Sequence, residues 1–306
     1  MKRVFSVLQT TAAKITFLVI ALTFCVWAIV AQWDQIVSAM GEMRTMPVVA
    51  AAVAGVVYVL WTYIAWHELL QGCGVSISYV KSSRIFFVSQ LGKYLPGGVW
   101  NFLAAAELGK GERISRVKST LVMFASLLIS IATGILIGSL ALVFGPQELR
   151  QEYWWVIFLL PLALVGLTPR VLNRVANTVM SRFSKDSAPV AFSGKSILKA
   201  SGWTVIAWLF AGLQIWLLAT TLGWDASANT FLLAAAAYAL AWVAGFVLVF
   251  APAGIGVREA VLGAVLSASV GAGGALVVVL LSRVLLTFTD VALGLVAIFI
   301  ARRNTA

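Results

Sequence analysis

Two long apolar segments of the chain are each interrupted by a short Pro/Gly motif, GKYLPGGVW at residues 92–100 and PAGIGVREA at residues 252–260. Proline removes a backbone donor and disrupts the preceding turn, and glycine allows conformations closed to other residues, so each motif ends one helix and lets another begin. The interrupted segments cover residues 85–108 and 231–270, with breaks at 96–98 and 252–254. These breaks predict two re-entrant hairpins; the alternative is two spanning helices kinked at proline.

The rest of the chain is unusually apolar. Of its 306 residues, 61% are hydrophobic and 11% are charged, against about 45–50% and about 25% in soluble proteins. So few charges cannot cover a water-exposed surface. The composition therefore excludes a soluble enzyme, a disordered chain and a nucleic-acid-binding protein, despite a net charge of +11. We expect one transmembrane domain over residues 1–306.

A bilayer core of about 30 Å needs about 20 apolar residues per helix. The chain is long enough for six full spans, which we expect at residues 15–31, 47–66, 117–144, 153–167, 201–222 and 275–301. The first apolar run exceeds the length of a signal peptide core, so we expect a retained helix. The predicted fold class is an all-α polytopic membrane protein of about six full transmembrane helices with two Pro/Gly-broken re-entrant hairpins.

Basic and acidic connecting segments alternate along the chain. Cytoplasmic loops of membrane proteins are rich in Lys and Arg, so this alternation places both termini and a connecting loop at about 168–200 in the cytoplasm. If both interrupted segments crossed fully, the bases from Lys110 to Lys118 would lie outside. Charge therefore favours re-entrant hairpins in a multi-pass protein of the cytoplasmic (inner) membrane.

The chain also contains a candidate internal repeat. A shift of 156 residues, the separation of Pro96 and Pro252, places residues 47–66 on 203–222 and 117–144 on 273–300. Predicted repeats therefore cover about 47–144 and 203–300. Because the charges put their hairpins on opposite faces, the arrangement is that of an inverted-topology repeat. Chance periodicity in an Ala/Val/Leu-rich chain is the alternative.

Several charged residues lie inside apolar segments, where each costs about 2.5–3.5 kcal/mol unless paired or solvated. The set comprises Arg258, Glu259, Arg283 and Asp290, with Lys93 and Asn101 flanking the first break. We expect the three basic side chains to bind a phosphate headgroup, and the two acids to orient them or exchange protons. The alternative is that Arg258–Glu259 and Arg283–Asp290 form internal salt bridges that only fix packing.

The breaks themselves are candidate binding elements. Helix starts near Gly98 and Ile255 would present free N–H groups to an anion. The residues that form the breaks are Pro96, Gly97, Gly98, Pro252, Gly254 and Gly256. Trp100, just past the first break, could line a substrate path.

Other features carry less functional information. His67, the single histidine, is expected to mark the cytoplasmic end of a span. Val171, Val175, Val179 and Phe183 recur at helical spacing and predict a short amphipathic surface helix or a plain connecting helix. No nucleophile, metal-ligand cluster or phosphate-binding loop is evident, so we expect no catalytic residue, no metal, no cofactor and no enzyme activity.

The motifs at 92–100 and 252–260 resemble a known pair in the flippase-like integral membrane family, which includes the transmembrane flippase domain of bacterial lysylphosphatidylglycerol synthases. Arg283 fits the same pattern, and the resemblance runs from the second span to the end of the chain. It implies translocation of a lipid headgroup between leaflets, in a cavity formed by the hairpins. One departure is the sequence MFAS at residues 123–126, where many relatives carry an acidic-basic pair. With no aminoacyl-transferase domain in the chain, lipid synthesis is not implied.

We therefore predict a lipid flippase or transporter that moves a phosphate-bearing lipid headgroup across the cytoplasmic membrane. Its expected partners are membrane phospholipids or polyprenyl-phosphate lipids, without nucleic acid, and a homo-oligomer is compatible with the sequence. The main alternative is a secondary transporter of a small water-soluble anion or metabolite. Further alternatives are a membrane enzyme, such as a lipid phosphatase, and a structural or regulatory membrane protein.

Overall fold

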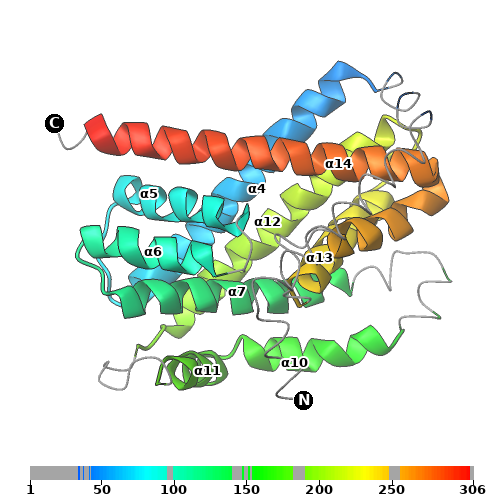
Figure 1. Cartoon of the computed structure of the whole chain (residues 1–306). Helices are drawn as coiled ribbons and strands as arrows, with labels where there is room; N and C mark the ends of the chain where they lie inside the picture. Colours follow the sequence, from blue (N-terminus) through cyan, green and yellow to red (C-terminus); the bar gives the residue numbers. More distant parts are fainter. Residues whose placement is uncertain are drawn as a thin grey trace, which may run out of the picture.

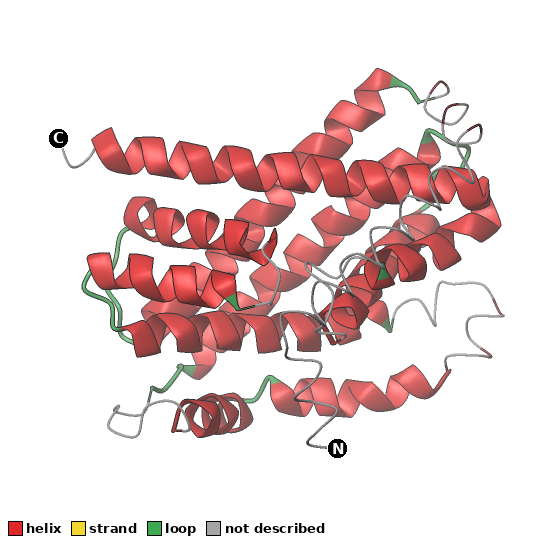
Figure 2. Cartoon of the chain, in the orientation of Figure 1, coloured by secondary structure: helices red, strands yellow, loops and turns green. Residues whose placement is uncertain are grey.

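The computed structural model describes residues 43–94, 99–139, 154–181, 190–247 and 256–303, with isolated residues 34, 37, 41, 147 and 151. These residues form helices and short connections, with no strand among them (Figures 1 and 2). In chain order the elements are α4 (Thr45–Gly72), α5 (Tyr79–Gln90), η1 (Leu91–Tyr94), α6 (Trp100–Gly111), α7 (Arg116–Gly138), η2 (Trp154–Phe158), α10 (Leu159–Gly166), α11 (Pro169–Ser181), α12 (Gly194–Thr220), α13 (Ala228–Val247) and α14 (Val257–Arg303). The span expected at 15–31 lies outside the described residues.

Five of the described helices, α4, α7, α12, α13 and α14, are long and apolar enough to cross a membrane, or six if one bent pair counts as a span. They cover the spans expected at 47–66 and 275–301, residues 201–220 of the span expected at 201–222, and residues 117–138 of the span expected at 117–144, of which residues 140–144 lie outside the described part. The prediction of an all-helical, multi-pass membrane protein is confirmed.

The expected span at 153–167 does not form one straight helix. It consists of η2 and the eight-residue helix α10, and the chain then bends by 78° into α11. Pro169 is the first residue of α11. Proline cannot donate the hydrogen bond that would continue α10, but it fits the first position of a new helix, where that N–H is unpaired anyway.

The centre of the molecule is an antiparallel pair, α4 and α12 (Figure 1). At one end of the pair, Gly72 of α4 lies so close to Ser196 of α12 that an added methyl group would clash. At the other end, Met43 and Leu222 both pack on Val277. Ends of the two helices that are far apart in sequence are therefore neighbours in space.

The first interrupted segment is a hairpin of two short helices. Helices α5 and α6 have 12 residues each, or about 18 Å at 1.5 Å per residue, less than a bilayer core. Their outer ends are joined by an ion pair between Lys81 and Glu112 at 3.3 Å. Their inner ends touch as well, since a methyl group on Gly92 would lie 2.6 Å from the backbone nitrogen of Asn101.

The second interrupted segment is longer. Helix α13 has 20 residues, or about 30 Å, enough to cross a bilayer core. Helix α14 is divided at Gly271, whose φ of 71° and ψ of 165° lie outside the helical region. The first part of α14 returns beside α13, and Leu222, just before α13, lies near Gly274, just after the kink. In Figure 1 this hairpin and the α5–α6 hairpin open toward opposite ends of the molecule.

The connecting segment expected at 168–200 contains α11 and an extended stretch of chain that is hydrogen-bonded to it. The Asn173 amide exchanges two hydrogen bonds with the backbone of Phe192, and the Asn177 amide does the same with Val190, at 2.8–3.1 Å. On α11 the side chains of Leu172 and Ala176 are buried, whereas that of Val175 is exposed. The amphipathic helix is therefore present, but its buried face is one residue away from the predicted stripe.

His67 is another residue whose surroundings differ from the expectation. Rather than marking a surface, it is fully buried in α4. Its ring nitrogens lie 2.8 Å from Ser82 and Gln71. The ring also stacks on Tyr79 with 4.0 Å between centroids. Its hydrogen bonds and stacking thus fix α5 against α4.

Candidate functional site

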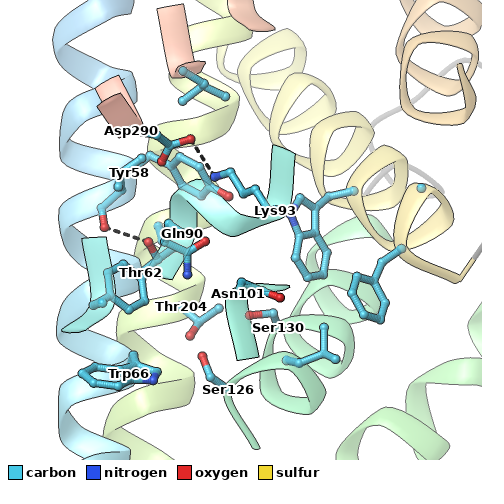
Figure 3. Close-up of a pocket in the computed structure, with 18 of the residues that line it drawn as sticks. Tyr58, Thr62, Trp66, Gln90, Lys93, Asn101, Ser126, Ser130, Thr204 and Asp290 are labelled. Atoms are coloured by element: carbon cyan, nitrogen blue, oxygen red, sulfur yellow. Dashed lines mark hydrogen bonds and ion pairs between the residues drawn. The ribbon is translucent and has the colours of Figure 1, made fainter. Parts of the chain in front are cut away.

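A cavity of about 270 Å³ lies between the two hairpins and the central helix pair. Both halves of the chain line it, and Figure 3 shows many of the polar side chains that surround it. Its polar and ionisable lining residues are Tyr58, Thr62, Trp66, Gln90, Lys93, Tyr94, Asn101, Ser126, Ser130, Thr204, Trp208, Tyr238, Trp242, Arg258, Arg283, Thr287 and Asp290.

The cavity brings together most of the residues selected from the sequence. Lys93, Asn101, Arg258, Arg283 and Asp290 all line it, although they come from η1, α6 and both parts of α14. These five therefore share one site.

Three further predictions about site residues have different outcomes. Glu259 does not line the cavity, but it binds a residue that does. Trp100 is 46% exposed and is not among the lining residues. Of the break residues, Gly256 has a φ of 91° in the turn before α14. Pro96, Gly97, Gly98, Pro252 and Gly254 lie outside the described residues.

The ion pairs in the site differ from those of the packing alternative. Glu259 pairs with Arg283, and Asp290 pairs with Lys93 at 2.6 Å. The pairs Arg258–Glu259 and Arg283–Asp290, which were the alternative to a binding role, are therefore not the ones that form. Adjacent residues on a helix point about 100° apart, and residues seven apart lie about 10 Å apart along the axis, so the helix geometry favours neither pair. Each carboxylate instead binds a base from another part of the fold.

Glu259 also caps the N-terminus of α14. Its Oε2 accepts a hydrogen bond from the backbone N–H of Gly256 at 2.6 Å. A Glu at the third helical position that binds the N-cap N–H is half of a capping box. This N–H is therefore already paired, and it is not open to an anion as the sequence had suggested.

Asp290 is almost fully enclosed, with 2% of its surface exposed. Its Oδ2 accepts hydrogen bonds from Lys93 and, at 2.5 Å, from the Tyr94 hydroxyl. The second carboxylate oxygen, Oδ1, has no hydrogen-bond partner in the described part of the chain. One face of this carboxylate is satisfied and the other remains able to accept.

Arg258 has no carboxylate partner of this kind. Its guanidinium lies over the ring of Tyr238, 4.3 Å from the centroid, a cation–π contact. None of the described carboxylates lies within 4 Å of it. With Lys93 and Arg283 each neutralised by an acid, Arg258 is the surplus positive charge of the site.

Part of the cavity lining, contributed by α4, α6, α7 and α12, is uncharged and rich in hydrogen-bonding groups. Trp66 Nε1 and Asn101 Oδ1 are buried and have no hydrogen-bond partner among the described residues. The hydroxyl groups of Ser126, Ser130 and Thr204 lie around the same space (Figure 3). Ser126 belongs to the sequence MFAS at residues 123–126, the point at which the chain departs from the family resemblance. Here the corresponding wall of the cavity is neutral.

Sequence analysis missed part of this site. Tyr58, Trp66, Thr204 and Tyr238 line the cavity, yet in the sequence each looks like an ordinary residue of a membrane helix. Aromatic residues near span ends are usually interfacial anchors, and single Thr residues are common in such helices. One signal could have found Tyr58. When the two proposed repeats are aligned by the 156-residue shift, Tyr58 corresponds to Gln214, so polar residues occupy the same position of both repeats.

Comparison with protein families identifies the chain. Residues 12–294 match the family model described as the lysylphosphatidylglycerol synthase TM region. A search of curated protein sequences found no match. The matched region is the flippase-like part of the synthases and not their catalytic part, and it fits a general role in membrane lipid transport.

Proposed function

Because the chain belongs to the family of lysylphosphatidylglycerol synthase transmembrane regions, we propose that it moves phosphate-bearing lipids between the leaflets of the cytoplasmic membrane. The headgroup would occupy the cavity between the hairpins while the acyl or prenyl chains stay in the bilayer. The observation that carries the proposal is Arg258, a cation without a carboxylate partner among the described residues, in a cavity built by both halves of the chain.

The electrostatics of the cavity suit a phosphodiester. Its single negative charge matches the surplus charge of Arg258, and a guanidinium can donate two parallel hydrogen bonds to phosphate oxygens. A charged headgroup is costly to move through hydrocarbon, so a polar cavity lowers that barrier. A volume of about 270 Å³, slightly below the usual range for ligand pockets of about 300–1,000 Å³, suits a headgroup and not whole acyl chains.

The arrangement of the hairpins supports alternating access. Helix α7 starts at Arg116 and the second part of α14 starts at residue 272, which corresponds to the 156-residue shift of the proposed repeat. The two hairpins open toward opposite ends of the molecule (Figure 1). Inverted repeats of this kind let one half of a transporter rock against the other around a central site. We propose that both hairpins are re-entrant and meet at the headgroup.

The charge distribution supports one orientation. Lys81, Lys110 and Arg116 lie at the open end of the α5–α6 hairpin, and Lys199 near the start of α12 pairs with Glu68 at 3.2 Å at the same end. The C-terminal end of α14 lies there as well (Figure 1). The positive-inside rule makes this end cytoplasmic, together with both termini.

Reconstitution into liposomes tests the function. Vesicles would carry phospholipids labelled on an acyl chain, and dithionite bleaching would report movement between leaflets. We expect the wild-type protein to move phosphate-bearing lipids faster than empty vesicles. Arg258→Gln should lower the rate about tenfold or more, as expected for a lost charge-assisted hydrogen bond of about 1.5–3 kcal/mol, whereas Arg258→Lys should retain part of it.

The matched control is Arg174→Gln, which removes an exposed arginine on α11 outside the cavity. The proposal fails if wild-type protein moves neither phospholipid nor polyprenyl phosphate faster than empty vesicles. Uptake of a free phosphate ester into the vesicle lumen, without lipid movement, would instead favour a transporter of water-soluble anions.

Cysteine labelling tests the topology. In a background with Cys25→Ser and Cys73→Ser, single cysteines would replace Ser76, Gly111 and Asp225, which are all exposed. Since Ser76 precedes the first hairpin and Gly111 ends it, both should react with an impermeant maleimide from the cytoplasmic side. Asp225→Cys should react only from outside. Labelling of positions 76 and 111 from opposite sides would show that this segment crosses the membrane.

A further inference from the structure

We propose that the cavity selects phosphodiester lipids whose headgroup is an uncharged polyol, such as a glycerol or a single sugar, over lipids with a cationic headgroup. This inference rests on the proposed function and names the class of substrate that the same cavity prefers. It follows from the distribution of charges, rings and unpaired polar atoms around the cavity.

The first argument is the absence of an available counter-charge for a cationic headgroup. Asp290 is the single carboxylate among the described residues that line the cavity. Its Oδ2 already binds Lys93 and Tyr94. An ammonium group could reach Oδ1, but Lys93 already neutralises this carboxylate, and the site also holds Arg258 and Arg283. Like charges at close range oppose binding, so a cationic headgroup is disfavoured.

The second argument concerns the aromatic wall. Tyr58, Trp208, Tyr238 and Trp242 line the cavity, with ring centroids 5.8 Å apart for the two tyrosines and 5.4 Å apart for the two tryptophans. Such a cluster could hold the quaternary ammonium of choline. Here the face of Tyr238 is covered by Arg258. The cluster thus positions a cation of the protein, which leaves it poorly suited to a cation of the lipid.

The third argument is the neutral wall, formed by Thr62, Trp66, Asn101, Ser126, Ser130 and Thr204. Trp66 Nε1 can only donate a hydrogen bond and Asn101 Oδ1 can only accept one, and neither has a partner in the described part of the chain. Trp66 is 1% exposed, so bulk water does not reach it readily. A hydroxyl group both donates and accepts, so the hydroxyls of a polyol can pair with atoms of either kind.

Hydroxyl side chains extend this wall. Thr62 and Thr204 donate their hydroxyl protons to backbone carbonyls at 2.7 Å, which leaves their oxygens as acceptors toward the cavity. Asp290 Oδ1 is a further buried acceptor without a partner among the described residues. Acceptors of this kind match the several O–H donors of a polyol.

The size of the cavity suits a small headgroup. About 270 Å³ corresponds to roughly nine water molecules at about 30 Å³ each. A phosphate with a glycerol or one sugar ring is of this size, and an oligosaccharide is not. The shared chemistry is therefore a phosphodiester with a small polyol, carried either by a diacylglycerol or by a polyprenyl chain.

Transport selectivity tests the inference in the reconstituted protein. The lipids compared are acyl-labelled phosphatidylglycerol, phosphatidylethanolamine, phosphatidylcholine and lysylphosphatidylglycerol, with a labelled polyprenyl-phospho-hexose as a separate arm. We expect phosphatidylglycerol or the polyprenyl lipid to move at least tenfold faster than the other three. Whichever of these two is faster identifies the carrier chain. Equal rates for all lipids, or faster movement of a cationic or zwitterionic lipid, would overturn the inference while leaving lipid transport intact.

Variants of the neutral wall assign the selectivity to it. Asn101→Leu combined with Ser130→Ala should reduce the preference for the polyol lipid at least fivefold. The matched control, Asn229→Leu combined with Ser267→Ala, changes the same residue types on the exposed start of α13 and on α14 outside the cavity. It should leave the preference unchanged. An undiminished preference in the cavity variant would contradict the role of this wall.

Binding measurements separate the two proposals. Detergent-solubilised protein would be titrated with phosphatidylglycerol and phosphatidylethanolamine and followed by native mass spectrometry. Selective binding of phosphatidylglycerol without any lipid movement would support the selectivity of the cavity and contradict flipping. Lipid movement without selective binding or selective rates would support flipping and contradict the selectivity of the cavity. If the protein neither binds phosphatidylglycerol selectively nor moves any lipid, both proposals are overturned.

Discussion

Glu259 forms its ion pair with Arg283, 24 residues further along the chain, and not with its neighbour Arg258. The pair joins the first part of α14 to its second part across the kink at Gly271. Because Glu259 also binds the N–H of Gly256, one carboxylate connects the turn before α14, the start of α14 and its long second segment. It also leaves Arg258 as the surplus cation.

Replacement of Glu259 separates its two contacts. Glu259→Gln keeps an oxygen for the Gly256 N–H but loses the charge, whereas Glu259→Ala loses both. Breaking a fully buried pair costs about 3–5 kcal/mol; Arg283 is 25% exposed and Glu259 14%, so we expect less for Glu259→Gln. Glu259→Ala should cost about 1 kcal/mol more, the typical contribution of a helix cap. Thermal unfolding in detergent measures the stability of the two variants. Equal melting temperatures for Glu259→Gln and Glu259→Ala would contradict the capping contact.

The pair between Lys93 and Asp290 should show strong coupling. Lys93→Met leaves the Asp290 carboxylate, 2% exposed, without its cation, and we expect a loss of about 3–5 kcal/mol. The double variant Lys93→Met/Asp290→Asn should be more stable than Lys93→Met alone. The exposed pair Arg116–Glu107, whose side chains are 56% and 61% exposed, serves as the control. Arg116→Gln should change stability by about 0–1 kcal/mol. If the stability losses of Lys93→Met and Asp290→Asn simply add in the double variant, the ion pair is contradicted.

Packing of α12 on α13 depends on Gly212. A methyl group there would lie 2.6 Å from the backbone nitrogen of Ala235 and closer still to other atoms of that residue, and backbone cannot move aside easily. We expect Gly212→Ala to destabilise by about 1–3 kcal/mol. Gly202, on the same helix, has nothing within 4 Å of an added methyl group. Gly202→Ala should be neutral or stabilise by up to about 1 kcal/mol. Similar melting temperatures for the two variants would contradict this packing.

The asparagine contacts on α11 should protect the amides they bind. The backbone N–H groups of Val190 and Phe192 donate to Asn177 and Asn173 at 2.9 and 2.8 Å. A hydrogen bond of about 1 kcal/mol corresponds to about a fivefold change in exchange. Asn173→Leu should therefore speed hydrogen exchange at Phe192 by about fivefold and leave α12 unaffected. Unchanged exchange at Phe192 would mean that this contact is absent in solution.

Much of the architecture could be predicted from the sequence. The spans at 47–66, 201–222 and 275–301 coincide with helices because apolar runs of that length can satisfy their backbone groups in a membrane only as helices. The first Pro/Gly break lies between two short helices, and the second lies between α13 and α14. The segment at 153–167 differs from the single helix expected, because apolar length alone does not show that the chain bends sharply before Pro169.

The candidate site was predicted only in part, for a physical reason. Intramembrane charges are costly, so Lys93, Arg258, Arg283 and Asp290 stand out in the sequence, and all four line one cavity. Tyr238 and Trp66 do not stand out, because an aromatic side chain costs little in a membrane wherever it lies.

Hydropathy and periodicity thus determined which segments are helices, where two of them break and which charges must be accounted for. Helix periodicity places a residue on a face but does not reveal what lies opposite that face. Only the tertiary structure decided that Glu259 binds Arg283, that Asp290 binds Lys93 and that Arg258 stacks on Tyr238. Each of these contacts joins segments whose proximity depends on the packing of the whole molecule.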